Sequence, residues 1–217
     1  GTKADFWSEA PGHGVITCTS VGEPKIDKNH ASIVTKNEWK KGDKKLFDET
    51  RTLHLYAFDD GSRLLVFDCD LQATGGDIVF GDTKEGSFGV RVNDQLRTSK
   101  GNGTITNAHG KTGEPACWGQ HAAWCDYSGK VDGKEVGVAV FDDPKNPSPA
   151  AWHVRGYGLL AANAFGRKSF PATKGQPELF QIPKGKDAHF RYGVFIHKGD
   201  AKTGNVAEHF QQFVKDR

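Results

Sequence analysis

The sequence contains no methionine and only four cysteines in 217 residues. The missing methionine places the natural start of translation upstream of Gly1, or in a removed leader, so we expect a processed product or a fragment. The cysteines have no CxxC spacing and are too few for a disulfide framework in a chain of this length, which argues against a zinc site. We expect free structural thiols throughout, with one disulfide as the alternative, at Cys18, Cys69, Cys117 and Cys125.

Long apolar runs and an excess of one charge are also absent. The longest apolar stretches, such as Val136–Phe141, fall far short of the ~20 residues that a helix needs to cross a bilayer. Nothing near the amino end has the succession of a signal peptide. Lys and Arg number 29 against 27 for Asp and Glu, so the net charge of +2 gives no strong field to collect polyanions. We expect a soluble protein that neither spans a membrane nor binds nucleic acid.

Several familiar sites are missing as well. The sequence has no GxSxG elbow, no P-loop and no GxGxxG after a strand, so acyl-serine and nucleotide chemistry lack their usual supports. We therefore expect no cofactor. Seven histidines lack the HxH or HxxxH spacing of metal ligands, so we expect no metal site and assign them no chemistry. They are His13, His30, His54, His109, His189, His197 and His209.

A period-two alternation of apolar and polar residues dominates the chain and predicts strands. Thr50–Phe58 and Arg63–Leu71 flank a turn and predict one hairpin, and Cys125–Val131 and Glu135–Phe141 flank Asp132-Gly133 and predict a second. Further strands are expected at Val15–Ser20, Ala31–Asn37, Gly86–Val92, Trp152–Arg155 and His189–His197.

Only one segment predicts a substantial helix. Asn205 is a plausible N-cap for Val206–Val214, in which Val206, Phe210 and Phe213 make an apolar stripe. No repeat or linker forces a boundary. We therefore predict an all-β fold, a large and mainly antiparallel β-sandwich with one C-terminal helix, as a single domain over residues 1–217.

The first stretch that could carry chemistry is Gly81–Arg91. It places an acid and two cations beside glycines that allow close approach of a ligand. Glu85 is the natural general base there, and Lys84 or Arg91 would stabilise developing negative charge. A solvated surface turn explains the same residues equally well.

The second stretch surrounds Trp124 and Asp126 in the predicted hairpin strand. Trp124 and Tyr127 fall on opposite faces of a regular strand, so they do not both line one pocket. An aromatic at such a position is more often core than a sugar-stacking platform. Asp126 is the better candidate for contact with a ligand, because it lies near a strand end.

The third stretch is Ala151–Gly158. Alternation puts Trp152 and Val154 on the core face and His153 with Arg155 on the other. An imidazole beside a guanidinium suits recognition of anions or hydroxyls, and His153 could act as a general acid near neutral pH. A surface ion pair of Arg155 is the alternative.

These stretches together resemble a known family. The runs GDTKEGSFGVR, HAAWCDYSGKVDGKEVGVAVFDDPKNP, WHVRGYGLLAANAFG and FRYGVFIHKGD are similar, in this order and with short gaps, to bacterial proteins of unknown function labelled PmoA, or methane oxygenase PmoA. Members are typically longer at the amino end, where a His-rich motif precedes a segment similar to Asp5–Glu9. The resemblance implies that this chain lacks the amino-terminal part of its domain, and that it exposes an apolar surface or fills it with that fragment or a second copy.

The resemblance also implies a fold and a setting. Members are similar to the large supersandwich folds of aldose epimerases and other carbohydrate-active enzymes, and many occur in bacteria that secrete glycan-degrading systems. We therefore expect an extracytoplasmic protein, periplasmic or secreted, that binds a carbohydrate ligand.

The resulting hypothesis is a protein that acts on a sugar or modified glycoside by acid/base chemistry, as an epimerase, lyase or hydrolase. Glu85 and His153 form the acid/base pair. The residues expected to bind substrate are Lys84, Arg91, Trp124, Asp126, Arg155 and Asn163. The rival hypotheses are a non-catalytic glycan-binding module, whose affinity would survive loss of Glu85, and a structural or assembly module whose polar residues pair internally.

Overall fold

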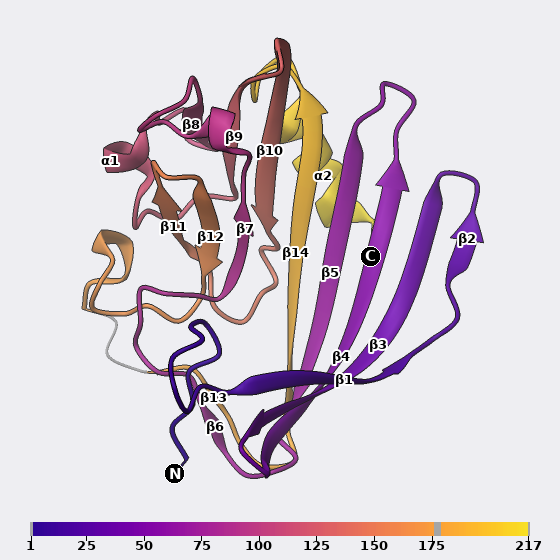
Figure 1. Ribbon diagram of the computed structural model, residues 1–217, viewed down its shortest axis with the longest axis vertical. Helices are drawn as coiled ribbons and strands as arrows, with labels where there is room; N and C mark the ends of the chain where they lie inside the picture. The colour runs from indigo at the N-terminus through magenta and orange to yellow at the C-terminus, as the bar shows by residue number, and fades with distance from the viewer. Residues whose placement is uncertain (1, 176–178, 217) are drawn as a thin grey trace.

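The computed structural model describes residues 2–175 and 179–216, which form a β-sandwich with one helix of more than a single turn (Figure 1). Nine strands make a large antiparallel sheet. Its order is β1 (Val15–Val21), β3 (His30–Lys41), β4 (Lys44–Ala57), β5 (Arg63–Gln72), β14 (Asp187–Lys198), β10 (Lys134–Asp142), β9 (Trp124–Val131) and β8 (Thr104–Asn107), with β2 (Lys25–Asp27) paired to β3.

The second layer is smaller. Three antiparallel strands form the small sheet, in the order β11 (Ala151–Arg155), β12 (Leu159–Asn163) and β7 (Phe88–Arg91). A third sheet has two short strands, β6 (Ile78–Val79) and β13 (Gln181–Ile182). The connections contain a one-turn helix, α1 (Glu114–Cys117), and two 3₁₀ turns, η1 (Asp94–Leu96) and η2 (Pro171–Thr173). The predicted all-β antiparallel sandwich is therefore confirmed.

The sandwich core lies between the two sheets because side chains alternate along each strand. Tyr127 and Val140 of the large sheet pack there with Trp152, Val154 and Leu160 of the small sheet. We call this side of the large sheet the core face. The alternation predicted for β11 is confirmed, since Trp152 and Val154 belong to this core.

The other side of the large sheet carries helix α2 (Val206–Lys215), and we call it the helix face. Val206, Phe210 and Phe213 of α2 are buried against Phe141 of β10 and Phe195 of β14. The predicted C-terminal helix is confirmed and lies against β14 in Figure 1. No helix in the described part of the chain is both long enough and apolar enough to cross a lipid bilayer.

The cap of this helix differs from the prediction. Asn205 adopts the left-handed conformation, with φ 51° and ψ 37°, and its side chain makes no capping hydrogen bond. An N-cap normally has extended backbone so that its side chain can reach the next free N–H groups. Here the chain enters α2 from a tight turn, so only the backbone oxygen of Asn205 is used, accepting from the N–H groups of Glu208 and His209.

Both predicted hairpins are present. β4 pairs with β5, and β9 pairs with β10 around Asp132 and Gly133, whose φ angles of 50° and 79° are the positive pair that a two-residue hairpin turn requires. The four cysteines carry free thiols, as expected, with Cys117 and Cys125 buried, Cys69 half-buried and Cys18 exposed.

Candidate functional site

Glu85 and His153 meet on the outer side of the small sheet. Glu85 lies in the bend that precedes β7, and His153 is the middle residue of β11, pointing away from the sandwich core. Their nearest atoms, Glu85 Oε2 and His153 Nε2, are 3.6 Å apart. Two residues 68 positions apart in the sequence therefore form one acid/base contact.

The proton on His153 is fixed by a neighbouring indole. The Nε1–H of Trp118 donates to Nδ1 of His153 at 3.1 Å, so Nδ1 is an acceptor and the ring proton of the neutral form is on Nε2. That N–H faces the carboxylate of Glu85. Burial lowers the pKa of His153, which favours the neutral imidazole at pH 7. The His153 side chain is 2% exposed, whereas that of Glu85 is 39% exposed, so the carboxylate remains open to a ligand.

Asn163 positions the segment that carries Glu85. Its Nδ2 donates to the Thr83 backbone oxygen at 2.9 Å, and its Oδ1 accepts from the N–H groups of Phe165 and Gly166. The hydroxyl of Thr83 in turn accepts from the N–H of Glu85 at 3.0 Å. Asn163 is 1% exposed, and both polar atoms of its side chain are hydrogen-bonded to backbone groups. It therefore supports the segment that carries Glu85 and does not contact a ligand directly.

Cations surround this contact. Lys84 Nζ lies 3.9 Å from Glu85 Oε1, and Arg155 Nε lies 3.2 Å from Oε1 of Glu114. The guanidinium of Arg91 lies over the ring of Tyr157 at 4.9 Å, and that of Arg155 lies 5.9 Å from the same ring. Tyr157 is 42% exposed. Lys84 and Arg155 are therefore close enough to act on the charge of His153, and Arg155 and Arg91 both lie near the exposed ring of Tyr157.

The structure separates two predicted residues from this group. Trp124 and Asp126 pair with Phe141 and Ala139 on β10 and so belong to the helix face of the large sheet, with both sheets between them and His153. Trp124 is 8% exposed and packs in the core beneath α2, in line with the alternative weighed for it.

Asp126 is fully buried. Its Oδ2 lies 3.0 Å from Nε2 of His197, whose Nδ1 contacts the backbone oxygen of Lys198. Burial raises the pKa of Asp126. The expected contact of Asp126 with a ligand is therefore not supported, because this carboxylate is fully buried and its partner is His197.

Three residues of the site were missed in the sequence. Glu114 is the first residue of α1, and Trp118 directly follows that helix. Tyr157 lies in the turn between β11 and β12. No periodic pattern marks the first two, since their contacts depend on how α1 docks beside β11. Tyr157 could have been found, because it stands two residues after Arg155 at the end of a predicted strand, where an aromatic side chain has no core to enter.

Comparison with known proteins gives one match. The profile described as "Family of unknown function (DUF6807)" matches residues 2–211, which is nearly the whole chain. No curated protein matches, and no solved structure matches.

Proposed function

We propose that this chain, which belongs to the family of unknown function DUF6807, is a carbohydrate-active protein that changes a sugar or modified glycoside by acid/base chemistry. The observation that carries the proposal is the contact of 3.6 Å between the half-exposed Glu85 carboxylate and the buried Nε2–H of His153. A carboxylate and an imidazole in contact are a common acid/base pair, because the carboxylate accepts a proton from a substrate and the imidazole supports the change of charge.

In the proposed mechanism Glu85 takes a proton from a carbon or hydroxyl of the sugar and becomes a carboxylic acid. The electron pair of the broken bond moves to a substrate oxygen, where Arg155, Arg91 and Lys84 stabilise the negative charge. His153 is buried and acts through Glu85, because its Nε2–H faces the carboxylate. Glu85 passes the proton it has taken to that oxygen or to a leaving group, whose departure gives a lyase product. Protonation of the carbon by water on its opposite face gives an epimer, and the hydroxide formed recovers the proton held by Glu85. For hydrolysis, Glu85 instead takes its proton from water, the water oxygen displaces the leaving group, and Glu85 protonates that group.

The surroundings support a hydroxyl-rich substrate. The exposed ring of Tyr157 offers an apolar face with a polar edge, which suits the faces of a sugar ring. The guanidinium groups of Arg91 and Arg155 flank that ring and donate hydrogen bonds in fixed directions.

The test is a screen of aldoses, glycosides and keto-glycosides in deuterated water, followed by proton NMR. We expect turnover or deuterium incorporation with the wild-type protein, and a loss of about 10²–10⁴-fold in Glu85→Gln, as is typical for removal of a general base. The thermal midpoint should hardly change, because this carboxylate is half-exposed. The matched control is Glu135→Gln, an exposed carboxylate paired with Lys130. A variant Glu85→Gln that keeps the wild-type rate contradicts the assignment.

A second candidate function is a non-catalytic glycan-binding module. The exposed Tyr157 ring between two guanidinium groups favours it, since such a platform binds sugars without any chemistry. In that case the wild-type protein turns over nothing in the screen, and Glu85→Gln keeps its affinity for the bound sugar. Tyr157→Ala should abolish binding under either hypothesis.

Two narrower statements belong to the same proposal. We identify DUF6807 with the bacterial family labelled PmoA, on the strength of the runs at residues 81–91, 121–147, 152–166 and 190–200. We also assign the protein to the extracytoplasmic space, which fractionation of the source cells would test. Recovery from the cytoplasm alone would contradict that assignment.

A further inference from the structure

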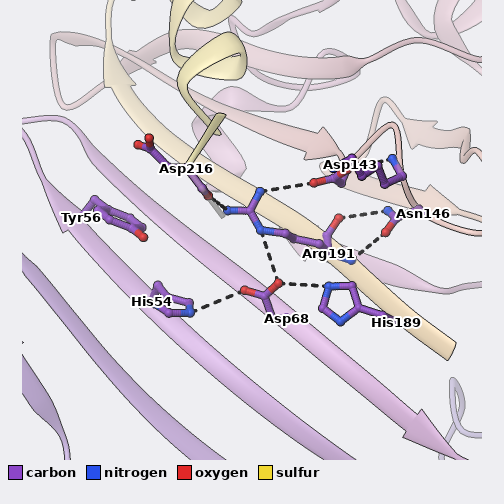
Figure 2. A pocket seen from close by; sticks show the side chains of 9 residues that line it. His54, Tyr56, Asp68, Asp143, Asn146, His189, Arg191 and Asp216 are labelled. Atoms are coloured by element: carbon purple, nitrogen blue, oxygen red, sulfur yellow. Dashed lines mark hydrogen bonds and ion pairs between the residues drawn. The ribbon is translucent and has the colours of Figure 1, made fainter. Parts of the chain in front are cut away.

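A second site candidate lies on the helix face, away from Glu85. A cavity of about 340 Å³ opens between the strands of the large sheet, the loop after β10 and the end of α2 (Figure 2). Its floor consists of the outward side chains of β4, β5 and β14. The residues that line it are His54, Tyr56, Asp68, Asp143, Lys145, Asn146, His189, Arg191 and Asp216.

Arg191 at the centre of this cavity is fully engaged by the protein. Its Nε lies 3.3 Å from Asp68 and one terminal nitrogen lies 3.3 Å from Asp143. The terminal nitrogens also donate to the backbone oxygens of Phe213 and Asp216, at 2.6 Å each. Figure 2 shows this guanidinium surrounded by its partners. It therefore has little capacity left to bind an anion.

The other charges in the floor are paired in the same way. His189 lies between two carboxylates, with Nε2 at 3.2 Å from Asp68 and Nδ1 at 2.7 Å from Asp70. These hydrogen bonds, that to Asp68 first, raise the pKa of His189 to about 9, so the ring is an imidazolium at pH 7. At the mouth, exposed Lys145 and Asp216 carry opposite charges. Charges cancel in pairs, and the cavity favours neither an anionic nor a cationic ligand.

What remains available is hydrogen bonding by uncharged groups. In the described chain the Tyr56 hydroxyl makes no hydrogen bond, and it points toward the cavity in Figure 2. Burial raises the pKa of Tyr56, so the hydroxyl keeps its proton. His54 Nε2 is 3.5 Å from Asp68, a contact too long for a strong hydrogen bond, so a ligand hydroxyl beside the pair could bind both.

An aromatic wall stands beside these groups. The rings of His30 and Tyr56 are stacked at 4.5 Å, and Nε2 of His30 lies 3.0 Å from Nδ1 of His54. Burial lowers the pKa of His54, which keeps that ring neutral. The described His, Cys, Asp and Glu side chains form no group of three placed to hold a metal ion. A flat wall with neutral donors and acceptors is suited to hydroxyl groups.

We propose that this cavity binds a small uncharged ligand with several hydroxyl groups, such as a single sugar ring or a polyol. Ligand pockets commonly measure about 300–1,000 Å³, so the volume of this cavity lies at the lower end of that range and suits a ligand of one ring. The site is independent of the proposed acid/base function, since the two sheets separate it from Glu85 and His153. The ligand hydroxyls bind Tyr56, His54 and Asp68.

The experiment is a titration of the whole chain with D-glucose, D-galactose, D-mannose and D-mannitol, following the imidazole proton NMR signals of His54 and His189. We expect saturable shifts with at least one of the four. Tyr56→Phe, which keeps the stacked ring, should weaken binding by about 3–10-fold, the usual value of one hydrogen bond. Glu135→Gln is the control and should leave these shifts unchanged, because this exposed carboxylate pairs with Lys130 and does not line the cavity. His54→Gln is a second variant should Tyr56→Phe fold poorly.

Three results would overturn the proposal. One is the absence of shifts with all four probes at millimolar concentrations. Another is a set of shifts produced only by inorganic phosphate or by zinc. The third is binding that both Tyr56→Phe and His54→Gln leave intact. Failure of the Glu85→Gln test leaves this titration unaffected, so the two proposals fail separately.

Discussion

The buried histidines of this protein differ in what their two ring nitrogens contact. His153 accepts at Nδ1 from Trp118, so the neutral ring keeps its proton on the nitrogen that faces Glu85. Both nitrogens of His197 face oxygen atoms, of Asp126 and of the Lys198 backbone, and both donate only when the ring is protonated. The neighbours of each ring thus decide whether its N–H is directed at an accessible carboxylate, as in His153, or only at buried structural partners, as in His197.

His189 makes the stability of the fold depend on pH. Its pKa is about 9 in the folded protein, above the usual 6.5, because Asp68 and Asp70 accept its ring protons. The stabilisation is therefore complete below pH 6.5 and is lost as the pH rises toward 9. We expect the denaturant midpoint of the wild-type protein to fall over this range, by a small amount since the side chain is 48% exposed. His189→Gln should remove this part of the slope. An unchanged slope in the variant would show that His189 is not its source.

Part of the candidate site could be predicted from local sequence. Alternation alone places His153 and Arg155 on the strand face opposite Trp152, and the structure has them there. The partners of these residues could not be predicted in the same way. Contact with Glu85 depends on the pairing of β12 with both β7 and β11, and the tautomer of His153 depends on an indole from α1. Neither the register between distant strands nor the position of α1 beside β11 produces a periodic pattern in the sequence.

Among the elements, long ones were predictable and short ones were not. β4, β5, β9, β10 and β14 have eight residues or more and alternate regularly, and each was predicted. β6 and β13 have two residues each, too few for any period to be seen. Such bridges form because a tertiary contact brings two extended segments together.

Helix α2 owes its position to packing more than to capping. Phe213 is 1% exposed, lies in the apolar cluster with Phe141, and its ring faces the guanidinium of Arg191 at 4.2 Å. We expect Phe213→Ala to lower the free energy of unfolding by about 3–5 kcal/mol, as a large-to-small change in a core does. Gln211→Ala, on the exposed side of the same helix, is the control and should change it little. Equal effects of the two, measured by urea unfolding, would mean that α2 is not docked as described.

At the scale of the whole molecule, the small sheet covers only part of the large one. Ile26, Ala31, Leu55, Leu65 and Val194 are successive cross-strand partners on the core face, from the edge strand β2 to the centre. The exposed fraction is 77% at Ile26 and 40% at Leu55, against 8% at Val194. Figure 1 shows β2 and β3 on the side away from the small sheet. The far end of the core face is therefore an exposed apolar surface.

Apolar surface of this kind favours association with other chains. We expect the sedimentation coefficient of the isolated chain to rise with concentration. Ile26→Lys should reduce this rise, because it puts a charge at the most exposed end of this row. Lys25→Ala changes the opposite face of the same strand and should have no such effect. A wild-type chain that sediments as a monomer at every concentration would contradict the expectation.

The central claim is that Glu85 and His153 act on each other, and the pKa of His153 tests it directly. Burial lowers this pKa, and the Glu85 carboxylate partly offsets the effect by favouring the charged ring. An NMR titration of His153, assigned with the variant His153→Gln, should therefore give a lower pKa in Glu85→Gln than in the wild-type protein, and no change in the control Glu135→Gln. A pKa of His153 that stays the same or rises in Glu85→Gln would contradict the pairing.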